Sequence, residues 1–515
     1  MTPLLTLGET LAVNAALHPD RIGARDLSRS MTFRVWNQRA CRLANALRGL
    51  GLAKGDRIAI LAYNCVEWME IYAATAKAGV IAVPINFRLT GEEILYIVEN
   101  CSARAFIVQD ELLESVAGIR DRLSVPMANY IHLGGKAVPS GYVGYEDFLA
   151  GAVDREPDVP VAPEDTWVIL YTSGTTGRPK GAMRNHGSHA LLSFGTLLDL
   201  ELSRNDTSLL VMPMCHANSL FFACAFATAG ATNCIYDRKS FDAEHMLATF
   251  GATGATFTSL VPTQYIMMLE LSAATKARHS LDGVRRLLIS SAPARRETKL
   301  AIMELFRNSG LLEMYGSTEQ AWATILKPSE QLTKLGSVGR ELTGTGRIKL
   351  LGDDGQEVPE GEVGEIYSRT PWCFQGYWNL PEKTAEAFRG AWMSVGDMAR
   401  RDADGFYTLV DRKNNMIISG GENIYPSEVE TVLAAHPKVR DVAVIGEPDA
   451  KWGESVRAVI VLRDGENATE AELADWCRAR LAGYKRPRAF SFITDAQMPR
   501  TATGKIQHRL LKGRV

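Results

Sequence analysis

The amino-acid sequence predicts a multidomain α/β protein, and three observations support this prediction. The first half alternates apolar runs with amphipathic stretches, which is typical of a parallel sheet covered by helices on both faces. This pattern starts again after residues 162–165, so we expect a second αβ unit. From about Gly336 the helical periods give way to short Gly-rich alternating stretches, and the last ~100 residues have the compact α+β pattern of a separate small domain.

In the first αβ unit, helices and strands are expected in strict alternation. Apolar residues recur with a helical period up to a stop marked by Gly49 and Gly51. Continuous apolar runs of strand length then alternate with further helical stretches. The expected helices cover residues 34–50, 66–79 and 91–100, and the expected strands cover residues 56–64, 80–86 and 103–109.

The second αβ unit is expected to contain six strands with helices between them, at residues 166–174, 206–213, 231–237, 254–262, 284–293 and 311–317. Residues 346–370 alternate over short stretches between glycines, which predicts a small antiparallel or barrel-like β unit. The C-terminal part is expected to form helices over residues 427–437 and 469–483 and strands over residues 439–447, 455–463 and 488–494.

Composition excludes several classes of protein. Of the 515 residues, 46% are apolar and 23% are charged, which is typical of a globular chain. The formal net charge of −2 gives no general attraction to nucleic acid, so no nucleic-acid partner is expected. The eight cysteines are scattered without a Cys-x-x-Cys pair, which favours free thiols in a reducing compartment over disulfides or a zinc site. With no signal-peptide pattern at the N-terminus, we expect a cytoplasmic protein.

One uncharged stretch, residues 207–236, is long enough to span a bilayer. Pro213, His216, Asn218 and Ser219 interrupt it, and its two halves have strand-like and helix-like character. We therefore expect a buried strand, a loop and a buried helix, and no integral membrane segment.

Residues 171–185 read YTSGTTGRPKGAMRN and form the most distinctive motif. Glycines let the backbone approach an anion closely, consecutive amide groups can form an anion nest, and the hydroxyls and Lys180 add donors and charge. The motif is not the common phosphate loop, because Arg178 and Pro179 separate Gly177 from Lys180 and Gly181 stands where a hydroxyl residue is usual. The alternative is a Gly/Thr-rich surface turn; the length and composition favour phosphate binding.

Three later motifs are modest when taken alone. After an expected strand, Tyr315 offers a flat face for a nucleotide base and Glu319 a hard oxygen ligand for Mg²⁺. Asp397 and Arg412 lie at the two ends of an expected hairpin, where a carboxylate could accept the ribose hydroxyls. Lys505 follows a glycine in a Pro/Thr-rich loop. The alternatives are an ordinary Tyr-Gly turn, a turn Asp with a surface Arg, and a solvated basic tail.

Taken together and in this order, the motifs resemble those of the adenylate-forming superfamily, which comprises acyl-CoA synthetases, aryl-CoA ligases, firefly luciferase and peptide-synthetase adenylation domains. The resemblance covers essentially the whole chain and is closest to the acyl-CoA and aryl-CoA ligase branch. The matching core motifs are residues 171–181, 315–319, 364–366, 394–397, 411–430 and 499–505.

The resemblance implies a large domain over residues 1–412 and a small mobile domain over residues 413–515. The large domain would consist of two αβ subdomains, at about 1–165 and 166–335, and a β-barrel-like subdomain at 336–412. It also implies a reaction in two halves. A carboxylate attacks the α-phosphate of Mg·ATP to give an acyl-adenylate and pyrophosphate. After the small domain rotates, the thiol of coenzyme A attacks the acyl carbon and releases AMP.

The resemblance also implies roles for individual residues. Lys505 would bridge the attacking carboxylate and the α-phosphate, Thr172 and Glu319 would bind Mg²⁺, and His216 would be a gate beside the acyl carboxylate. For His216 the alternative is a satisfied core histidine. The implied ATP- and AMP-binding residues are Thr172, Ser173, Gly174, Thr175, Thr176, Gly177, Lys180, Ser291, Ala292, Pro293, Tyr315, Gly316, Ser317, Thr318, Asp397 and Arg412.

Two further sets of residues follow from the same resemblance. The acyl pocket would be formed by His216, Asn218, Ser219, Thr263, Ser290 and Tyr315. Coenzyme A would be bound by Ser419, Gly420, Gly421, Trp452, Tyr484 and Arg486, although residues 484–488 could equally be a solvated cluster after a helix. The sequence departs from the family at Asn414, where the hinge residue is usually Asp or Lys, and at Val395, where Thr more often precedes Gly-Asp.

The expected substrate is a hydrophobic monocarboxylic acid, which could be fatty, alicyclic or aromatic, including hydroxycinnamic. No Arg or Lys was identified in the expected pocket that would bind a second carboxylate. Three functions stay open at this point: an acyl-CoA ligase, a stand-alone adenylating enzyme that loads a carrier protein, and a non-catalytic nucleotide-binding scaffold. The protein is expected to be a monomer or a homodimer.

Overall fold

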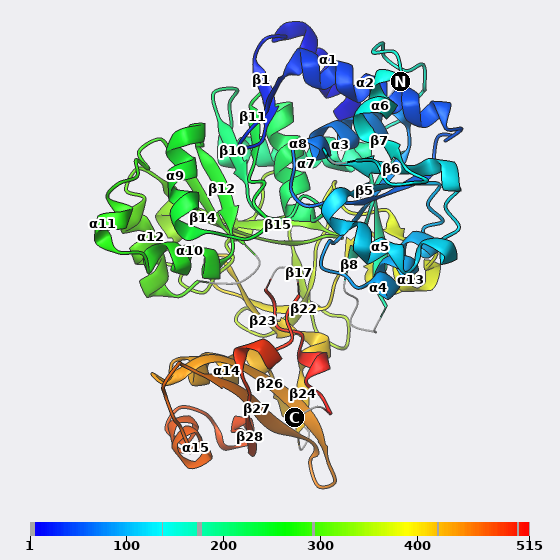
Figure 1. The fold of residues 1–515 in the computed structure, drawn as a ribbon. Helices are drawn as coiled ribbons and strands as arrows, with labels where there is room; N and C mark the ends of the chain where they lie inside the picture. Colours follow the sequence, from blue (N-terminus) through cyan, green and yellow to red (C-terminus); the bar gives the residue numbers. More distant parts are fainter. Residues whose placement is uncertain are drawn as a thin grey trace. The chain divides into compact units, whose positions relative to one another are not determined.

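The computed structural model describes residues 6–135, 137–172, 178–290, 294–419, 422–501 and 504–513 (Figure 1). Contacts divide the chain into two compact units. Unit 1 comprises residues 1–335, 339–347 and 368–393, and unit 2 comprises residues 336–338, 348–367 and 394–515. The sheet formed by residues 348–367 and 394–412 is therefore grouped with the C-terminal segment, and the boundary after Arg412 stays a prediction.

The first sheet of unit 1 has, among the described residues, eight strands in the order β19–β9–β8–β4–β3–β5–β6–β7. Strands β8, β4, β3, β5, β6 and β7 are parallel, whereas β9 and β19 extend the β8 edge in antiparallel pairing. The strands are β3 (Arg57–Leu61), β4 (Ile81–Ile85), β5 (Ala105–Gln109), β6 (Tyr130–Leu133), β7 (Val143–Gly144), β8 (Thr166–Thr172), β9 (Lys180–Asn185) and β19 (Gly376–Tyr377).

The second sheet of unit 1 has nine strands within the described ranges, in the order β16–β15–β14–β13–β12–β10–β11–β1–β2. It is parallel from β1 to β14 and antiparallel at both ends. The strands are β1 (Ile22–Arg25), β2 (Ser30–Thr32), β10 (Thr207–Leu210), β11 (Thr232–Ile235), β12 (Phe257–Leu260), β13 (Arg286–Ile289), β14 (Gly310–Ser317), β15 (Ala321–Leu326) and β16 (Arg340–Glu341); β20 (Phe388–Arg389) and β21 (Trp392–Met393) form a separate hairpin.

The helices of unit 1 follow the expected alternation with the parallel strands. They are α1 (Leu7–Leu17), α2 (Phe33–Gly49), α3 (Glu67–Ala78), α4 (Gly91–Asn100), α5 (Leu113–Ala117), α6 (Tyr145–Ala150), α7 (His186–Leu200), α8 (Ala217–Thr228), α9 (Ala243–Thr253), α10 (Pro262–Leu269), α11 (Ala273–Lys276), α12 (Arg296–Leu305) and α13 (Pro381–Ala387). Thr32 caps α2 by accepting a hydrogen bond from the Val35 amide, and α3 ends at Gly79, whose φ of +65° favours glycine.

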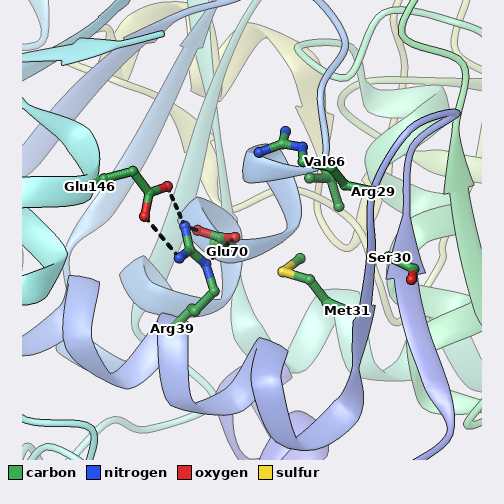
Figure 2. A pocket seen from close by; sticks show the side chains of 7 residues that line it. All are labelled: Arg29, Ser30, Met31, Arg39, Val66, Glu70 and Glu146. Atoms are coloured by element: carbon green, nitrogen blue, oxygen red, sulfur yellow. Dashed lines mark hydrogen bonds and ion pairs between the residues drawn. The ribbon is translucent and has the colours of Figure 1, made fainter. Parts of the chain in front are cut away.

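A cavity of about 400 Å³ lies among β2, α2, α3 and α6 (Figure 2). Its two guanidinium groups are paired within the protein: Arg39 forms ion pairs with Glu70 and Glu146, both at 2.7 Å, and Arg29 forms one with Glu67, also at 2.7 Å. These pairs satisfy the charges that line the cavity, so we assign the cavity to the architecture of the fold. Its lining residues are Arg29, Ser30, Met31, Arg39, Val66, Glu70 and Glu146.

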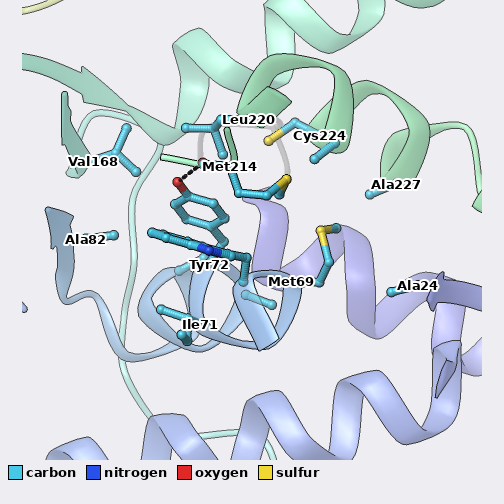
Figure 3. Close-up of a cluster of buried hydrophobic side chains, with 14 of the residues drawn as sticks. Ala24, Met69, Ile71, Tyr72, Ala82, Val168, Met214, Leu220, Cys224 and Ala227 are labelled. Carbon is cyan, nitrogen blue, oxygen red and sulfur yellow. Dashed lines mark hydrogen bonds between the residues drawn. The ribbon is translucent and has the colours of Figure 1, made fainter. Parts of the chain in front are cut away.

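The main core of unit 1 lies between the two sheets and is filled by α2, α3, α7 and α8. Figure 3 shows part of it, where the buried Tyr72 hydroxyl donates a hydrogen bond of 2.7 Å to the Met214 carbonyl. A second core lies on the other face of the first sheet under α4 and α5, and a third lies on the other face of the second sheet under α9, α10 and α12. Each large sheet therefore carries helices on both faces, as the sequence predicts.

Within its described residues, unit 2 contains two sheets. The first is antiparallel, in the order β17–β18–β22–β23, and the second has the path β25–β24–β27–β26 with β28 pairing to β27. The elements are β17 (Lys349–Leu351), β18 (Gly364–Tyr367), β22 (Asp397–Arg401), β23 (Tyr407–Arg412), β24 (Ile417–Ser419), β25 (Glu422–Ile424), α14 (Pro426–Ala434), β26 (Val439–Asp449), β27 (Gly453–Leu462), α15 (Glu470–Arg478) and β28 (Ala489–Phe492).

Residues 207–236 fold as β10, a loop, α8 and β11, so the prediction of a buried strand, loop and helix is confirmed. No helix in the part of the chain that the structure describes has both the length and the apolar character needed to cross a bilayer. All eight cysteines lie in the described ranges and are free thiols, as the sequence predicts.

Candidate functional site

The ends of the predicted phosphate loop are held by neighbouring strands of the first sheet. Thr172 ends β8, Lys180 begins β9, and the two residues are register partners in an antiparallel pair. The Thr172 hydroxyl also donates a 3.4 Å hydrogen bond to the Lys180 carbonyl. Strand β9 follows the loop, and α7 begins at His186. The predicted phosphate ligands Ser173, Gly174, Thr175, Thr176 and Gly177 lie outside the described residues.

Lys180 and Glu319 are brought together by Tyr377, which the sequence reasoning missed. The Tyr377 hydroxyl donates a 2.9 Å hydrogen bond to Oε1 of Glu319, a carboxylate that is only 7% exposed. The Lys180 ammonium lies 4.1 Å from the centre of the Tyr377 ring. Loss of hydration lowers the pKa of Lys180, and the charge of Glu319 opposes that shift. Unit 1 thus places the loop lysine and the predicted magnesium ligand around one tyrosine.

The turn that carries Glu319 has a specific backbone requirement. Strands β14 and β15 form a hairpin with a bulge between Tyr315 and Gly316. A Cβ atom on Gly316 would lie 2.0 Å from the carbonyl oxygen of Ala321, so only glycine fits there. Ser317 accepts a 3.1 Å hydrogen bond from the Gln320 amide and closes the turn around Thr318. The predicted nucleotide-pocket residues Ser291, Ala292 and Pro293 lie outside the described residues.

The predicted acyl-pocket residues converge at the N-terminal end of α8. The Asn218 amide donates to the Ser259 hydroxyl at 3.0 Å, and that hydroxyl donates to Ser290 at 3.3 Å. The Ser219 hydroxyl donates to the Met212 carbonyl at 2.6 Å and is satisfied by the backbone. Thr263, by contrast, is exposed on α10.

His216 immediately precedes α8 and is half-buried. Burial lowers the pKa of His216 to about 4, and the positive charge of Arg88 acts in the same direction. The imidazole is therefore neutral at physiological pH. Among the described residues its Nε2 atom has no hydrogen-bond partner. The role of His216 as a gate stays a prediction.

Unit 2 brings together the other three predicted polar residues of the nucleotide site. Asp397 and Arg412 are register partners in the β22–β23 hairpin, and the Arg412 Nε donates to Asp397 Oδ1 at 3.1 Å. The side chain of Lys505 reaches solvent. Loss of hydration lowers the pKa of Lys505, the nearby Arg412 lowers it further, and Asp397 raises it. Lys505 therefore lies within electrostatic range of the hairpin pair.

The Lys505 turn is closed by its own backbone. The Thr501 amide donates to the Lys505 carbonyl at 2.7 Å, and the Lys505 amide donates to the Thr501 hydroxyl at 3.1 Å. His508 anchors the segment that follows, because its Nε2 atom lies 2.6 Å from Glu430 Oε1 on α14.

The predicted hinge residue Asn414 lies in the 3-10 turn Lys413–Asn415, directly after β23. The structure describes its backbone but not its side chain. Its neighbour Lys413 is bound by two carboxylates of the first sheet of unit 2, Asp353 at 2.9 Å and Glu365 at 3.2 Å. The Asn415 side chain donates to Asp411 Oδ1 at 3.1 Å. Polar contacts thus hold the turn on both sides of Asn414.

The predicted coenzyme A residues lie at one end of the second sheet of unit 2. Ser419 pairs with Gly453, the residue that follows Trp452; Gly420 and Gly421 lie outside the described residues. Arg488, which the sequence reasoning did not select, lies 4.5 Å from the Trp452 ring centre.

The other two predicted coenzyme A residues differ in their surroundings. Tyr484 is exposed, with the Lys485 ammonium 5.6 Å from its ring centre. The Arg486 guanidinium donates to the carbonyls of Leu481 and Arg478 at 2.9 and 3.2 Å, so within unit 2 it is bound to backbone.

The donor set allows Mg²⁺ only in a site shared with a ligand. Glu319 and Thr172 supply hard oxygen donors, which suit Mg²⁺. Within the described ranges no group of three or more His, Cys, Asp or Glu side chains could hold a metal ion. Mg²⁺ typically binds one or two carboxylates together with substrate phosphates and water, so the residues present fit this mode.

Two family profiles match the chain. The profile described as "AMP-binding enzyme" matches residues 11–378, and "AMP-binding enzyme C-terminal domain" matches residues 428–505. The chain belongs to the AMP-binding enzyme family. Thr172, Lys180, Tyr315, Glu319 and Tyr377 all fall within the first match, so the resemblance predicted from the sequence motifs is confirmed.

Three members of this family illustrate what the chain is similar to. It is 36% identical over 511 residues to a feruloyl-CoA synthase of Amycolatopsis sp, covering 99% of this chain and 98% of the relative. It is 33% identical over 509 residues to an indoleacetate–CoA ligase of Aromatoleum aromaticum, covering 98% of this chain and 97% of the relative. Its fold matches the crystal structure of the anthranilate CoA ligase AuaEII in complex with anthranoyl-AMP with a TM-score of 0.88. The two sequences are 28% identical, and the match covers 99% of this chain and 97% of the other.

Proposed function

We propose that this AMP-binding enzyme joins a hydrophobic aromatic monocarboxylic acid to coenzyme A in an ATP-dependent reaction that passes through an acyl-adenylate. The observation that carries the proposal is the cluster of Lys180, Tyr377 and Glu319 beside the phosphate loop of unit 1. The pairing of Asp397 with Arg412, near Lys505 in unit 2, supports the same proposal, because the family resemblance gives these residues roles in binding the ribose and the reacting oxygens.

The first half-reaction joins two anions, so it needs positive charge at the reacting phosphate and at the leaving group. In the proposed step an oxygen of the substrate carboxylate forms a bond to the α-phosphorus. The bond to the β-phosphate bridging oxygen breaks, and pyrophosphate leaves with that electron pair. Lys180 and the loop would hold the departing pyrophosphate, and Lys505 would neutralise the carboxylate and α-phosphate oxygens. Mg²⁺ bound by Glu319 and Thr172 would neutralise charge on the phosphates.

The nucleoside would be held by an aromatic ring against the base and by a carboxylate against the ribose. Tyr315 lies at the end of β14, where its ring can stack on adenine. Asp397 would accept the ribose hydroxyls while Arg412 fixes the carboxylate through its Nε contact. His216, neutral because of its low pKa, would lie beside the acyl carboxylate as a gate without adding charge.

In the second half-reaction the sulfur of coenzyme A attacks the acyl carbon, the bond to the AMP oxygen breaks, and the thiol proton leaves to solvent. Ser419, Trp452, Tyr484 and Arg486 are the proposed contacts of coenzyme A. Arg486 could reach a phosphate only after releasing its two backbone carbonyls, whereas Arg488 is already beside Trp452.

The aromatic character of the substrate is supported by what the three relatives are named for, since ferulate, indoleacetate and anthranilate are all aromatic monocarboxylic acids. The proposal is therefore narrower than the hydrophobic acid that the sequence predicts. A cytoplasmic location, the hinge role of Asn414 and a monomeric or dimeric state stay predictions.

ATP–pyrophosphate exchange with a panel of acids tests the proposal. The panel contains ferulate, indoleacetate, anthranilate, a cyclohexane carboxylate and palmitate, each with and without coenzyme A. We expect exchange with one or more aromatic acids and a thioester when coenzyme A is present. Exchange only with palmitate would overturn the aromatic assignment. Exchange without a thioester would favour loading of a carrier protein, and no exchange with any acid would favour a non-catalytic scaffold.

A further inference from the structure

Arg184 is a fully buried arginine on β9, four residues after the loop lysine Lys180. Its guanidinium donates three hydrogen bonds to backbone carbonyls. Nη1 donates to Thr318 at 3.0 Å and to Glu319 at 3.4 Å, and Nη2 donates to Trp372 at 2.8 Å. The guanidinium also lies 4.8 Å from the ring centre of Phe221 on α8. One side chain therefore links β9 to the Glu319 turn, to the segment before β19 and to the helix that follows His216.

The burial of this cation is energetically unfavourable. All three acceptors are carbonyl oxygens, so in the described structure no carboxylate ion pair offsets its desolvation. Burial lowers the pKa of Arg184 to about 10, which leaves it charged at physiological pH. An apolar side chain would fill the same space with a smaller desolvation penalty. The stability of the fold therefore does not explain why an arginine occupies this position.

Those contacts converge on the residue with the predicted magnesium role. The Tyr377 hydroxyl holds the Glu319 carboxylate at 2.9 Å. At the other end of the same residue, the Glu319 carbonyl accepts from the Phe374 amide at 2.7 Å and from Arg184 at 3.4 Å. Lys180 and Arg184 lie on the same side of β9, because side chains four residues apart in a strand point to the same face. The strand that presents the loop lysine thus also fixes the backbone of Glu319.

We propose that Arg184 is a positioning residue of the nucleotide site, which fixes the Thr318–Glu319 turn relative to β9 so that Glu319 and Lys180 meet the phosphates in a constant geometry. The inference rests on the proposed adenylation function. It assigns no contact between Arg184 and substrate, because the side chain is 0% exposed. The planar fork of arginine can serve carbonyls from separate segments at once, whereas lysine is a point charge on a flexible stem and cannot reproduce that geometry.

Two variants separate positioning from charge. Arg184→Lys keeps the charge and most of the apolar stem but loses the fork, and Arg184→Met loses both. Arg120 offers a matched control, because its guanidinium also donates to two backbone carbonyls, Ser140 at 3.2 Å and Gly141 at 2.6 Å, and lies over the rings of Tyr130 and Tyr142. It is remote in the first sheet, beside β6, so Arg120→Lys and Arg120→Met test the loss of similar contacts elsewhere.

The readouts are KM for Mg·ATP, KM for the acid and kcat in pyrophosphate exchange, together with calorimetric binding of Mg²⁺ and a non-hydrolysable α,β-methylene ATP. We expect kcat/KM for Mg·ATP to fall about 10²-fold in both Arg184 variants, by analogy with small misplacements of a catalytic group. The KM for the acid should stay within threefold, and both Arg120 variants should resemble the wild type. A merely structural role would instead reduce the active fraction, lowering kcat without raising KM for Mg·ATP.

Several results would overturn the inference. If Arg184→Lys matched the wild type, charge alone would be sufficient. If Arg184→Met kept kcat/KM for Mg·ATP within threefold, Arg184 would have no functional role. Should Arg184→Met fail to fold, the Lys variant decides alone. If the wild type bound the ATP analogue with Mg²⁺ but exchanged pyrophosphate with no acid, the proposed reaction would fail, while analogue binding by the variants would still test positioning.

Discussion

Replacing Tyr377 by Phe removes one hydroxyl from the candidate site and little else. The hydroxyl donates a 2.9 Å hydrogen bond to the buried carboxylate of Glu319. The phenyl ring that remains can keep its contact with the Lys180 ammonium, 4.1 Å from the ring centre. The variant therefore isolates the orientation of Glu319 from the placement of Lys180.

The magnitude follows from the kind of hydrogen bond. A hydrogen bond to an ionised group contributes about 1.5–3 kcal/mol. If Glu319 needs this contact to face the phosphates, its loss should appear in transition-state stabilisation, where each 1.36 kcal/mol is about a factor of ten. We expect kcat/KM for Mg·ATP in pyrophosphate exchange to fall about 10- to 100-fold and the Mg²⁺ concentration for half-maximal rate to rise.

The first sheet offers a matched control. Tyr145 likewise donates a 2.8 Å hydrogen bond to a buried carboxylate, that of Glu70, beside the cavity of Figure 2. Tyr145→Phe should destabilise the fold by about 1–2 kcal/mol without changing the KM for Mg·ATP. The reasoning is refuted if Tyr377→Phe keeps kcat/KM and Mg²⁺ dependence within twofold of the wild type, or if both variants change them equally.

Three further predictions concern unit 2. Lys505→Ala should slow adenylation about 10²–10³-fold, by analogy with the loss of one preorganised donor. The variant should slow thioester formation from added acyl-adenylate far less. Equal losses of the two rates in single-turnover assays would contradict this prediction. Trp452→Ala should raise the KM for coenzyme A about threefold to tenfold, because the variant loses the ring and its contact with the Arg488 cation. The rate of pyrophosphate exchange should not change. A changed exchange rate would show that the role of Trp452 is not confined to coenzyme A. Loss of hydration lowers the pKa of His508, but its hydrogen bond and charge contact with Glu430 raise it more, so the net shift is upward. The pair should therefore stabilise the protein fully below about pH 6.5 and lose this effect as the pH rises through the raised pKa. His508→Gln should lower the free energy of unfolding by about 1 kcal/mol at pH 6 and very little at pH 9. A loss of unfolding free energy that is the same at both pH values would count against the ion pair.

Much of the fold could be predicted because local patterns determine it. The apolar runs that became β3, β4 and β5 are continuous, since strands of a covered parallel sheet are buried on both faces. Two antiparallel edge strands were missed for different reasons. The six residues of β9 lie inside the Gly-rich motif of residues 171–185 and were interpreted as part of a loop, whereas β19 has only two residues, too few for a local pattern.

In the candidate site, too, residues in local motifs could be predicted, whereas residues whose roles depend on distant contacts could not. Glu319, Asp397 and Lys505 were found because each lies in a local motif with an unusual composition. The register pairing of Asp397 with Arg412 confirms the predicted hairpin. Tyr377 and Arg184 were missed because their roles depend on pairing between β9 and β19, which are far apart in sequence, and no local pattern encodes such a contact. The one signal that could have drawn attention to Arg184 was a charged residue directly after the apolar Ala182 and Met183 in "GAMRN".

The pairing of β9 with β19 also affects how the protein is made. Met183 and its partner Gly376 are about 190 residues apart, and a ribosome adds ~5–20 residues per second. During synthesis, the outer side of β9 therefore stays unpaired for about 10–40 s, as an open edge of the kind that invites pairing with other chains. A nascent chain that stalls in this interval would present that edge, and it would lack Tyr377. Synthesis must therefore pass about three-quarters of the chain before Tyr377 can join Lys180 and Glu319, and until then β9 is a segment that a ribosome-associated chaperone could usefully cover.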